Sequence, residues 1–367
     1  MKFAFDTAEQ IAETVDLIDE AEAKEEFEPI LQKCIQRAQV LKNHDLEFEA
    51  RYSYLNLVTH LNKKDLAIGS FPWLLNYIDQ YPSWYDRFRV LWCYKWVIIS
   101  LPQFTSISKA KIEQLRLDME KRYQEADAGT KVIHYFKCLL AIYQGELKVA
   151  AEHYEAYKLD EEAGSLDDCE ACQPNALMEL FMFQKDYQQA LDSVQVVLSK
   201  RKTCKDVPAT TFPAAAFAHL MLNQEEEAAH MFANAQREMD FDTPWLDDIG
   251  YLLMYCAMTG QWVQGRKILE KQLPFTAARQ PEYKLYWFYL GVHMFFRAMS
   301  ASGLSDISLK VEKAETGFPL KGETCDLGES ISWLNQRLTD LSNAIDQRNG
   351  NSFYRELRDY HEAMIAS

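Results

Sequence analysis

One helical phrase recurs along the middle of this chain and limits what the chain can fold into. Four strong copies occupy residues 144–157, 184–198, 223–235 and 260–273. Each copy has a small residue followed four positions later by a larger apolar or aromatic one. These pairs are Ala150/Tyr154, Ala190/Val194, Ala228/Phe232 and Gly265/Leu269. Because positions i and i+4 share a helix face, the small residue admits a second helix and its neighbour fills the gap beside it.

Two weaker copies come earlier in the chain, with Ala67/Phe71 and Ala110/Gln114 at the same positions. Successive small residues are 37 to 43 residues apart, and an apolar stretch of helical period precedes each copy. A helix pair repeated in this way cannot bury its apolar face alone, so neighbouring pairs must stack. The sequence therefore predicts an all-α chain whose helix pairs stack into a solenoid.

This pattern resembles the tetratricopeptide repeat (TPR) over roughly residues 45 to 275, with longer loops than the usual ~34-residue unit. The resemblance implies a right-handed α-solenoid of TPR-like helix pairs with modified N- and C-terminal caps. It also implies that the first helix of each pair lines a concave groove, which holds an extended or helical peptide. The segments "SKRKTCKDVP" (199–208) and "DQRNGN" (346–351) are similar to a functionally uncharacterised group of bacterial TPR proteins. In that group a histidine often follows the proline of the first segment, where this chain has Ala209.

The ends of the chain differ from the repeats, as the caps of a solenoid do. The predicted parts are an acidic N-terminal helical cap (1–43), TPR-like helix hairpins (44–275) and a C-terminal helical cap (276–367). An irregular insertion near 301–328 interrupts the helical period, and its alternating segment "ISLKV" (307–311) predicts a short strand.

Two helices are predicted after the insertion, over residues 329–347 and 352–366. An Asn-Gly turn joins them, because left-handed backbone angles cost little there. Asn351 or Ser352 is the expected cap of the last helix.

Charge and hydropathy narrow the class of protein. The net charge is −16, and a chain this acidic repels phosphate backbones, so we expect no nucleic-acid partner. The first residues lack the apolar core of a signal peptide, and no run of 18 uncharged apolar residues occurs, so we expect no membrane partner. Eight cysteines without a secretory signal indicate a reducing compartment. The prediction is a cytoplasmic protein.

Three cysteines form the strongest candidate for chemistry. Cys169 and Cys172, at C-x-x-C spacing, precede the first helix of a hairpin, and Cys204 follows its second helix. Those two ends of an antiparallel pair lie together, so the sulfurs are expected within ~7 Å of one another. Three alternatives remain open at this point: one structural zinc, packed thiols, or a redox-active pair favoured by the helix N-terminus. Structural zinc takes four ligands, and Asp167 or Asp168 would be an unusual fourth.

Catalytic patterns are absent elsewhere. The chain contains no G-x-x-x-x-G-K-[ST], G-x-G-x-x-G, G-x-S-x-G or H-E-x-x-H, and its eight histidines are scattered. The sequence therefore predicts that the protein is not an enzyme.

The predicted function is that of a non-enzymatic cytoplasmic adaptor or regulator, which binds a protein or peptide in the concave TPR groove. Two stretches of the sequence, 84–96 and 283–296, are rich in aromatic residues. We expect contacts with the partner where an aromatic residue in them lies next to a charged one. The candidate partner-binding residues are Arg87, Arg89, Lys95, Tyr283, Lys284 and Trp287. One alternative is a zinc- or redox-responsive sensor acting through the three cysteines. Another is a toxin-neutralising immunity protein, since an acidic groove suits a basic target.

Overall fold

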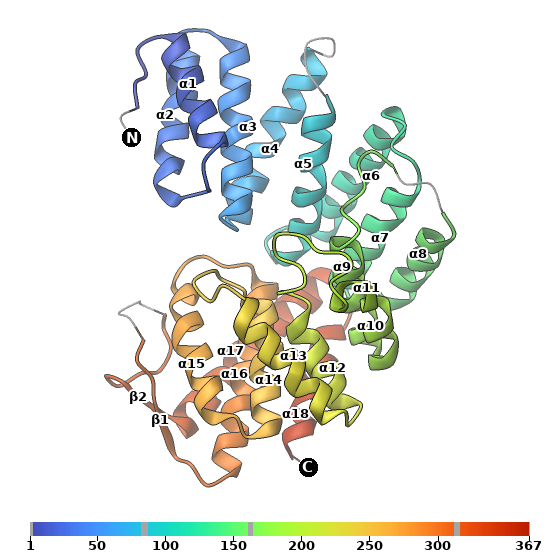
Figure 1. Ribbon diagram of the computed structural model, residues 1–367, viewed down its shortest axis with the longest axis vertical. Coiled ribbons are helices and arrows are strands. Elements are labelled where there is room, and N and C mark those ends of the chain that lie inside the picture. Colours follow the sequence, from blue (N-terminus) through green and yellow to red (C-terminus); the bar gives the residue numbers. More distant parts are fainter. Residues whose placement is uncertain (1–2, 82–86, 161–163, 312–315, 367) are drawn as a thin grey trace. The chain divides into compact units, whose positions relative to one another are not determined.

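The chain is mostly helical, and its helices pack in sequential pairs (Figure 1). A computed structural model describes residues 3–81, 87–160, 164–311 and 316–366. The chain divides into two compact units, which we call unit 1 and unit 2. Unit 1 comprises Met1–Leu101 with Ile112–Ala128, and unit 2 comprises Pro102–Lys111 with Gly129–Ser367.

Unit 1 is a series of helices in which each packs on the next. Its helices are α1 (Ala8–Asp19), α2 (Glu28–Val40), α3 (His44–His60), α4 (Lys64–Gln80), α5 (Arg87–Ser100) and most of α6 (Lys109–Glu125). Side chains start two of them: Thr7 and Gln10 form a capping box on α1, and Asn43 accepts the N–H of Leu46 on α3.

Unit 2 contains the strong copies of the repeated phrase. We call the leading helix of each pair a first helix. The first helices of unit 2 are α7 (Lys131–Tyr143), α9 (Cys172–Gln184), α12 (Phe212–Met221), α14 (Leu246–Thr259) and α16 (Glu282–Ala301). Each of the first four packs on the helix that follows it. Those second helices are α8 (Leu147–Leu159), α10 (Tyr187–Ser193) with α11 (Gln195–Leu198), α13 (Glu225–Glu238) and α15 (Trp262–Gln272).

The small residues of the repeat lie where helices meet. Ala150, Ala190 and Ala228 are fully buried. A Cβ atom on Gly265 would lie 2.4 Å from the ring of Phe295, so this position has no room for a side chain. The prediction that Ala110 is a small residue buried between two helices is wrong, because Ala110 is exposed. Helix α6 instead buries Ile112, Met119 and Tyr123.

Helices α14 and α16 make the closest contact between first helices. Gly250 of α14 and Gly291 of α16 face each other, so the two backbones touch with no side chain between them. The sequence analysis did not single out these two glycines. They fall outside the repeated phrase, in the apolar stretches that precede or follow it.

The irregular insertion contains a short strand that overlaps only the start of the predicted segment 307–311. Strand β1 (Asp306–Ser308) pairs antiparallel with β2 (Thr324–Asp326), and Ile307 lies opposite Cys325. Beyond it come α17 (Leu327–Asn349) and α18 (Phe353–Ala366), close to the two predicted last helices. Gly350 between them has φ +77°, as the Asn-Gly turn requires.

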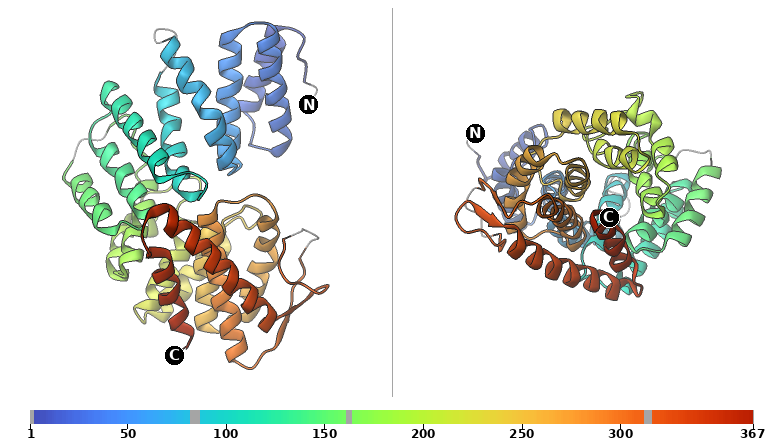
Figure 2. Two further views of the ribbon diagram at one scale, coloured as in Figure 1. Left: turned by 180° about the vertical axis from the view of Figure 1, so that it is seen from behind. Right: turned by 90° about the horizontal axis from the view of Figure 1, so that it is seen from below.

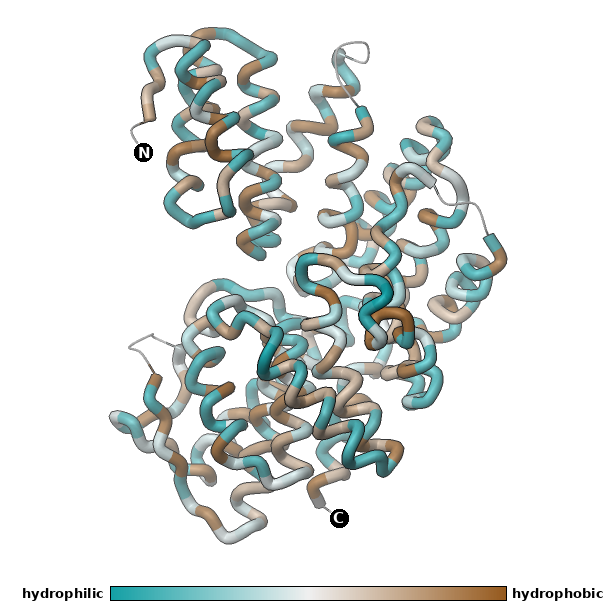
Figure 3. The backbone as a smooth tube through the Cα atoms, in the orientation of Figure 1, coloured by the Kyte–Doolittle hydropathy of each residue, from teal (hydrophilic) through white to brown (hydrophobic). Residues whose placement is uncertain are grey.

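Hydrophobic and hydrophilic residues alternate along the helices of both units, as expected for helices with one buried face (Figure 3). Within the described ranges, none of the helices combines the length and the apolar character needed to cross a bilayer.

Candidate functional site

The last helix, α18, packs against α17 and α16, and its side chains also contact α7, α9 and α12 (Figure 2). At its N-terminal half, the Tyr354 hydroxyl donates to the carbonyl oxygen of Tyr143 in α7 at 2.8 Å. The Phe353 ring lies 5.1 Å from the ring of Phe183 in α9. The Tyr286 hydroxyl of α16 donates back to the carbonyl oxygen of Tyr354 at 2.8 Å.

The C-terminal half of α18 continues along the same surface. The His361 ring lies 5.8 Å from the Phe217 ring of α12 and 5.9 Å from the Trp287 ring of α16. The Tyr360 and Tyr187 hydroxyls are 2.9 Å apart, which links α18 to α10. We call the surface of α7, α9, α12 and α16 that α18 covers the α18 groove.

The sequence of α18 explains why it lies there. Tyr354, Leu357 and His361 recur at helical spacing and are buried, whereas Arg355 and Asp359 on the other side are exposed. An amphipathic helix of this kind needs an apolar surface to cover, and the α18 groove provides it.

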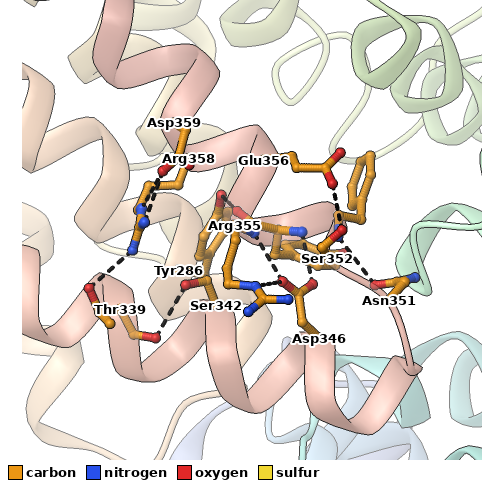
Figure 4. Close-up of polar contacts among 12 residues, drawn as sticks. Tyr286, Thr339, Ser342, Asp346, Asn351, Ser352, Arg355, Glu356, Arg358 and Asp359 are labelled. Atoms are coloured by element: carbon orange, nitrogen blue, oxygen red, sulfur yellow. Dashed lines mark hydrogen bonds and ion pairs between the residues drawn. The ribbon is translucent and has the colours of Figure 1, made fainter.

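A buried carboxylate fixes the start of α18 (Figure 4). Asp346 is only 1% exposed, and it accepts the backbone N–H groups of Tyr354 at 2.9 Å and Arg355 at 3.1 Å. The Arg355 guanidinium also pairs with it at 3.1 Å. Asn351, one of the two expected caps, accepts the N–H of Phe353 at 3.3 Å. The stronger cap, Asp346, was missed because it acts from the preceding helix.

The "DQRNGN" segment also holds the last hairpin to the first residues of unit 2. The Arg348 guanidinium donates to the carbonyl oxygens of Pro102 at 2.6 Å and Phe104 at 3.1 Å. The Lys109 ammonium donates to the carbonyl oxygen of Asn349 at 3.1 Å. This segment is therefore a structural junction.

An acidic cluster lies beside α18 on the same first helices. The hydroxyls of Tyr251 and Tyr283 each donate to the Glu179 carboxylate at 3.2 Å. Burial, with a smaller effect of Asp247, raises the pKa of Glu179, the two tyrosine hydrogen bonds lower it, and the net result is a pKa of about 7. Glu179 also escaped the sequence analysis, because one glutamate among 55 acidic residues carries no signal.

Three predicted partner-binding residues lie within this region but are buried. Tyr283 and Lys284 are 4% exposed and Trp287 is 1% exposed. Lys284 pairs with Asp247 at 3.3 Å, and Tyr283 donates to Glu179. These side chains therefore hold unit 2 together and do not face solvent, in contrast to what the mixed pattern of rings and charges suggested.

The other three predicted contacts belong to unit 1. Arg89 forms two hydrogen bonds to Glu49, at 3.0 and 2.9 Å, and its guanidinium lies 4.0 Å from the ring centre of Tyr52. Lys95 is 1% exposed, and its ammonium lies 3.2 Å from the ring centre of Trp92. Arg87 is 3.7 Å from Glu125 and keeps a side-chain exposure of 39%. Arg87 and Arg89 thus stay partly accessible, whereas Lys95 does not.

The three cysteines converge as predicted. The sulfur atoms of Cys169, Cys172 and Cys204 all lie within 4.8 Å of one another. Cys172 is the first residue of α9, and its backbone N–H donates to the sulfur of Cys169 at 3.3 Å. Burial raises the pKa of Cys169, but hydrogen bonds from Cys172, Ala171 and Cys204 outweigh it and leave that pKa below its ordinary value. Burial, together with Cys169 and Cys204, raises the pKa of Cys172 strongly. The group could hold a metal ion.

Two buried groups should give unit 2 opposite pH dependences. The folded-state pKa of Glu179, about 7, lies above 4.5 in the unfolded chain, so its stabilising effect is present below pH 4.5 and is lost as pH rises toward 7. Burial, with a smaller effect of Lys185 and against a hydrogen bond to Leu357, lowers the pKa of His361 from 6.5 to about 4. Its stabilising effect is therefore present above pH 6.5 and is lost as pH falls toward 4.

We expect single variants to separate these two effects. In Glu179→Gln, only the His361 effect remains, so the free energy of unfolding should rise by about 2 kcal/mol from pH 4.5 to 6.5. In His361→Asn, only the Glu179 effect remains, and the free energy should fall by about 2 kcal/mol over that range. Urea unfolding at several pH values measures both slopes. Glu152→Gln, an exposed change on α8, should leave the wild-type profile unchanged. Equal slopes in the two variants would contradict the assignment.

Comparison with known proteins does not assign this chain to a family. No protein-family model matches the chain, and no curated protein matches it.

Proposed function

We propose that this protein is a non-enzymatic adaptor or regulator whose unit 2 receives an amphipathic helix in the α18 groove. The proposal includes the finer fold, a right-handed TPR-like solenoid in which the first helices line the binding surface. The observation that supports it is the seating of α18 across α7, α9, α12 and α16. The chain itself thus supplies an example of the ligand.

The contacts of α18 define the kind of partner. A partner helix would need three anchors that match Tyr354, Leu357 and His361. These are an aromatic residue, an aliphatic residue three positions later, and a flat ring four positions after that. Recognition of a helix through anchors at such spacing is a recurring binding mode. The net charge of −16 favours a partner with basic residues around these anchors.

In this proposal α18 is also a regulator. While it covers the groove, a partner helix can bind only to the fraction of molecules in which α18 has left. The apparent affinity of the partner is reduced by that fraction. Anything that weakens the seating of α18 would therefore strengthen partner binding.

A peptide experiment tests the proposal in the full chain. A fluorescent peptide of residues 351–367 is titrated with wild-type protein and with Leu357→Ala, and its anisotropy is measured. Truncating buried leucine costs about 2–5 kcal/mol, so the variant should bind the peptide at least ~10-fold more tightly than wild type.

Two controls make the result specific. Asp359→Ala, on the exposed side of α18, should bind the peptide no better than wild type does. A peptide that itself carries Leu357→Ala should lose its binding to the variant protein. Absence of peptide binding to a Leu357→Ala protein with a wild-type circular dichroism spectrum would overturn the proposal, as would equal binding to wild type and variant.

The second candidate function is a zinc- or redox-responsive sensor, which the convergence of Cys169, Cys172 and Cys204 favours. A sensor should lose thermal stability on addition of a chelator or an oxidant. An adaptor without such a site should not.

A further inference from the structure

The three exposed or half-exposed cysteines differ from the other cysteines of the chain. Cys34, Cys93, Cys138, Cys256 and Cys325 are each fully buried in the core. Cys169 and Cys204 are exposed and Cys172 is intermediate, so core packing does not account for them. Cys169 lies in the loop before α9, Cys172 is the first residue of α9, and Cys204 lies in the loop before α12.

The surrounding contacts hold these two loops together. Lys202, two residues before Cys204, pairs with Glu170, which lies between Cys169 and Cys172. Thr211 donates to the Asn175 side chain of α9 at 2.5 Å, just after the second loop. The three sulfurs are therefore placed by contacts outside the group itself, as ligands of a preformed site are.

The spacing of the sulfurs suits one ion. Zinc–sulfur bonds of about 2.3 Å in a tetrahedron place two sulfurs about 3.8 Å apart. The sulfurs already lie within 4.8 Å of one another, so ligation needs shifts of about 1 Å or less. A disulfide between two of them would leave the third without a role. One metal ion uses all three, and the N–H of Cys172 already directed at the Cys169 sulfur favours its thiolate.

The nearby carboxylates are engaged elsewhere. Asp167 accepts the N–H of Gly164 at 3.0 Å, and Asp168 accepts the hydroxyl of Tyr135 at 3.3 Å. Over the described part of the chain, no histidine or carboxylate joins the three cysteines as a further ligand. Because Cys169 and Cys204 are exposed residues, water can reach an ion held by the three sulfurs. Zinc sites with three protein ligands hold water or a small ligand in the fourth position, whereas structural sites have four protein ligands.

We propose that Cys169, Cys172 and Cys204 bind one Zn²⁺ ion as three thiolates, with the fourth coordination position open to water or a small exogenous ligand. Each thiol releases its proton to solvent as it binds. The bound ion would join the start of α9 to the loop before α12, and so both ends of one hairpin. This inference goes beyond helix binding and does not depend on it.

Cobalt serves as the spectroscopic probe of the site. The full chain, reduced with a phosphine and freed of metal, is titrated with Co²⁺ and its absorption spectrum is recorded. One equivalent should produce sulfur-to-cobalt charge-transfer bands and the intense visible bands of tetrahedral Co²⁺, and Zn²⁺ should abolish both. Cys169→Ser, Cys172→Ser and Cys204→Ser should each lose most of the charge-transfer intensity. Cys325→Ser, beside Ser330 in the core, should retain it and so control for loss of a cysteine.

Three results would overturn the proposal. The first is failure of the fully reduced chain to bind Co²⁺ or Zn²⁺. The second is an unchanged cobalt spectrum in Cys204→Ser, which would remove that residue from the site. The third concerns the open position: added imidazole should shift the visible bands, and an unshifted spectrum would mean that the protein supplies a fourth ligand. The peptide assay above should be indifferent to all three cysteine variants, which keeps the two proposals separable.

Discussion

Replacing Gly291 with alanine is expected to lower the free energy of unfolding of unit 2 by about 3 kcal/mol or more. The added Cβ would lie 2.4 Å from the carbonyl oxygen of Gly250 and 2.8 Å from its Cα. Both atoms belong to the backbone of α14, so no side chain can rotate away to make room. The two helices would have to separate, and the close-packed residues on either side would lose their contacts.

The chain offers a matched control for this change. Gly69 also lies inside a helix, α4, but a Cβ there would have nothing within 4 Å. Gly69→Ala should therefore be neutral or stabilise by up to about 1 kcal/mol, because alanine is the better helix former. Urea unfolding followed by circular dichroism measures both. Similar values for Gly69→Ala and Gly291→Ala would show that the contact between α14 and α16 is not as tight as described.

The second large effect is expected at Asp346. Asp346→Ala removes the carboxylate that accepts the N–H groups of Tyr354 and Arg355 and pairs with the Arg355 side chain (Figure 4). Hydrogen bonds to a charged group contribute about 1.5–3 kcal/mol, and a buried donor left unpaired adds its own cost. We expect a loss of about 3 kcal/mol in the free energy of unfolding.

Two further substitutions define what Asp346 does. Asp346→Asn keeps one acceptor oxygen without the charge, so its loss should be intermediate. Asp340→Ala, on the exposed side of the same helix, should cost about 0.5 kcal/mol or less. Because Asp346 positions α18, its alanine variant should also bind the 351–367 peptide more tightly than wild type does. If Asp346→Ala behaved like Asp340→Ala, the carboxylate would not be the cap of α18.

The helical period of the sequence was sufficient to predict the helix pairs, since it shows which face of each helix is apolar and must be buried. It also predicted the small residue at Gly265, whose lack of a side chain admits Phe295. It failed at α6, where Ala110 mimics the repeat although Ile112 and Met119 face the interior. A small residue alone does not identify the buried face when its i+4 neighbour is polar.

The position of α18 on the first helices of unit 2 could not be predicted in the same way. The pattern of α18 shows that one face is apolar, but it does not say which surface covers that face. The pairing of rings with charges was ambiguous for a similar reason. Arg89 with Glu49 and Lys284 with Asp247 are partners far apart in sequence, so a charge beside a ring looked available when it was already paired. The cysteines were predictable because hairpin geometry alone brings the two ends together.

The junction at Arg348 has a consequence for how such a chain can change in length. Tandem arrays usually grow or shrink by duplication or deletion of whole modules, because each module contacts only its neighbours. Here Arg348 and Asn349 of the last hairpin contact Pro102, Phe104 and Lys109 at the start of unit 2. An added or deleted helix pair would separate these partners. The contacts between the last hairpin and the start of unit 2 therefore fix the number of helix pairs. Unit 2 should accordingly melt in a single transition.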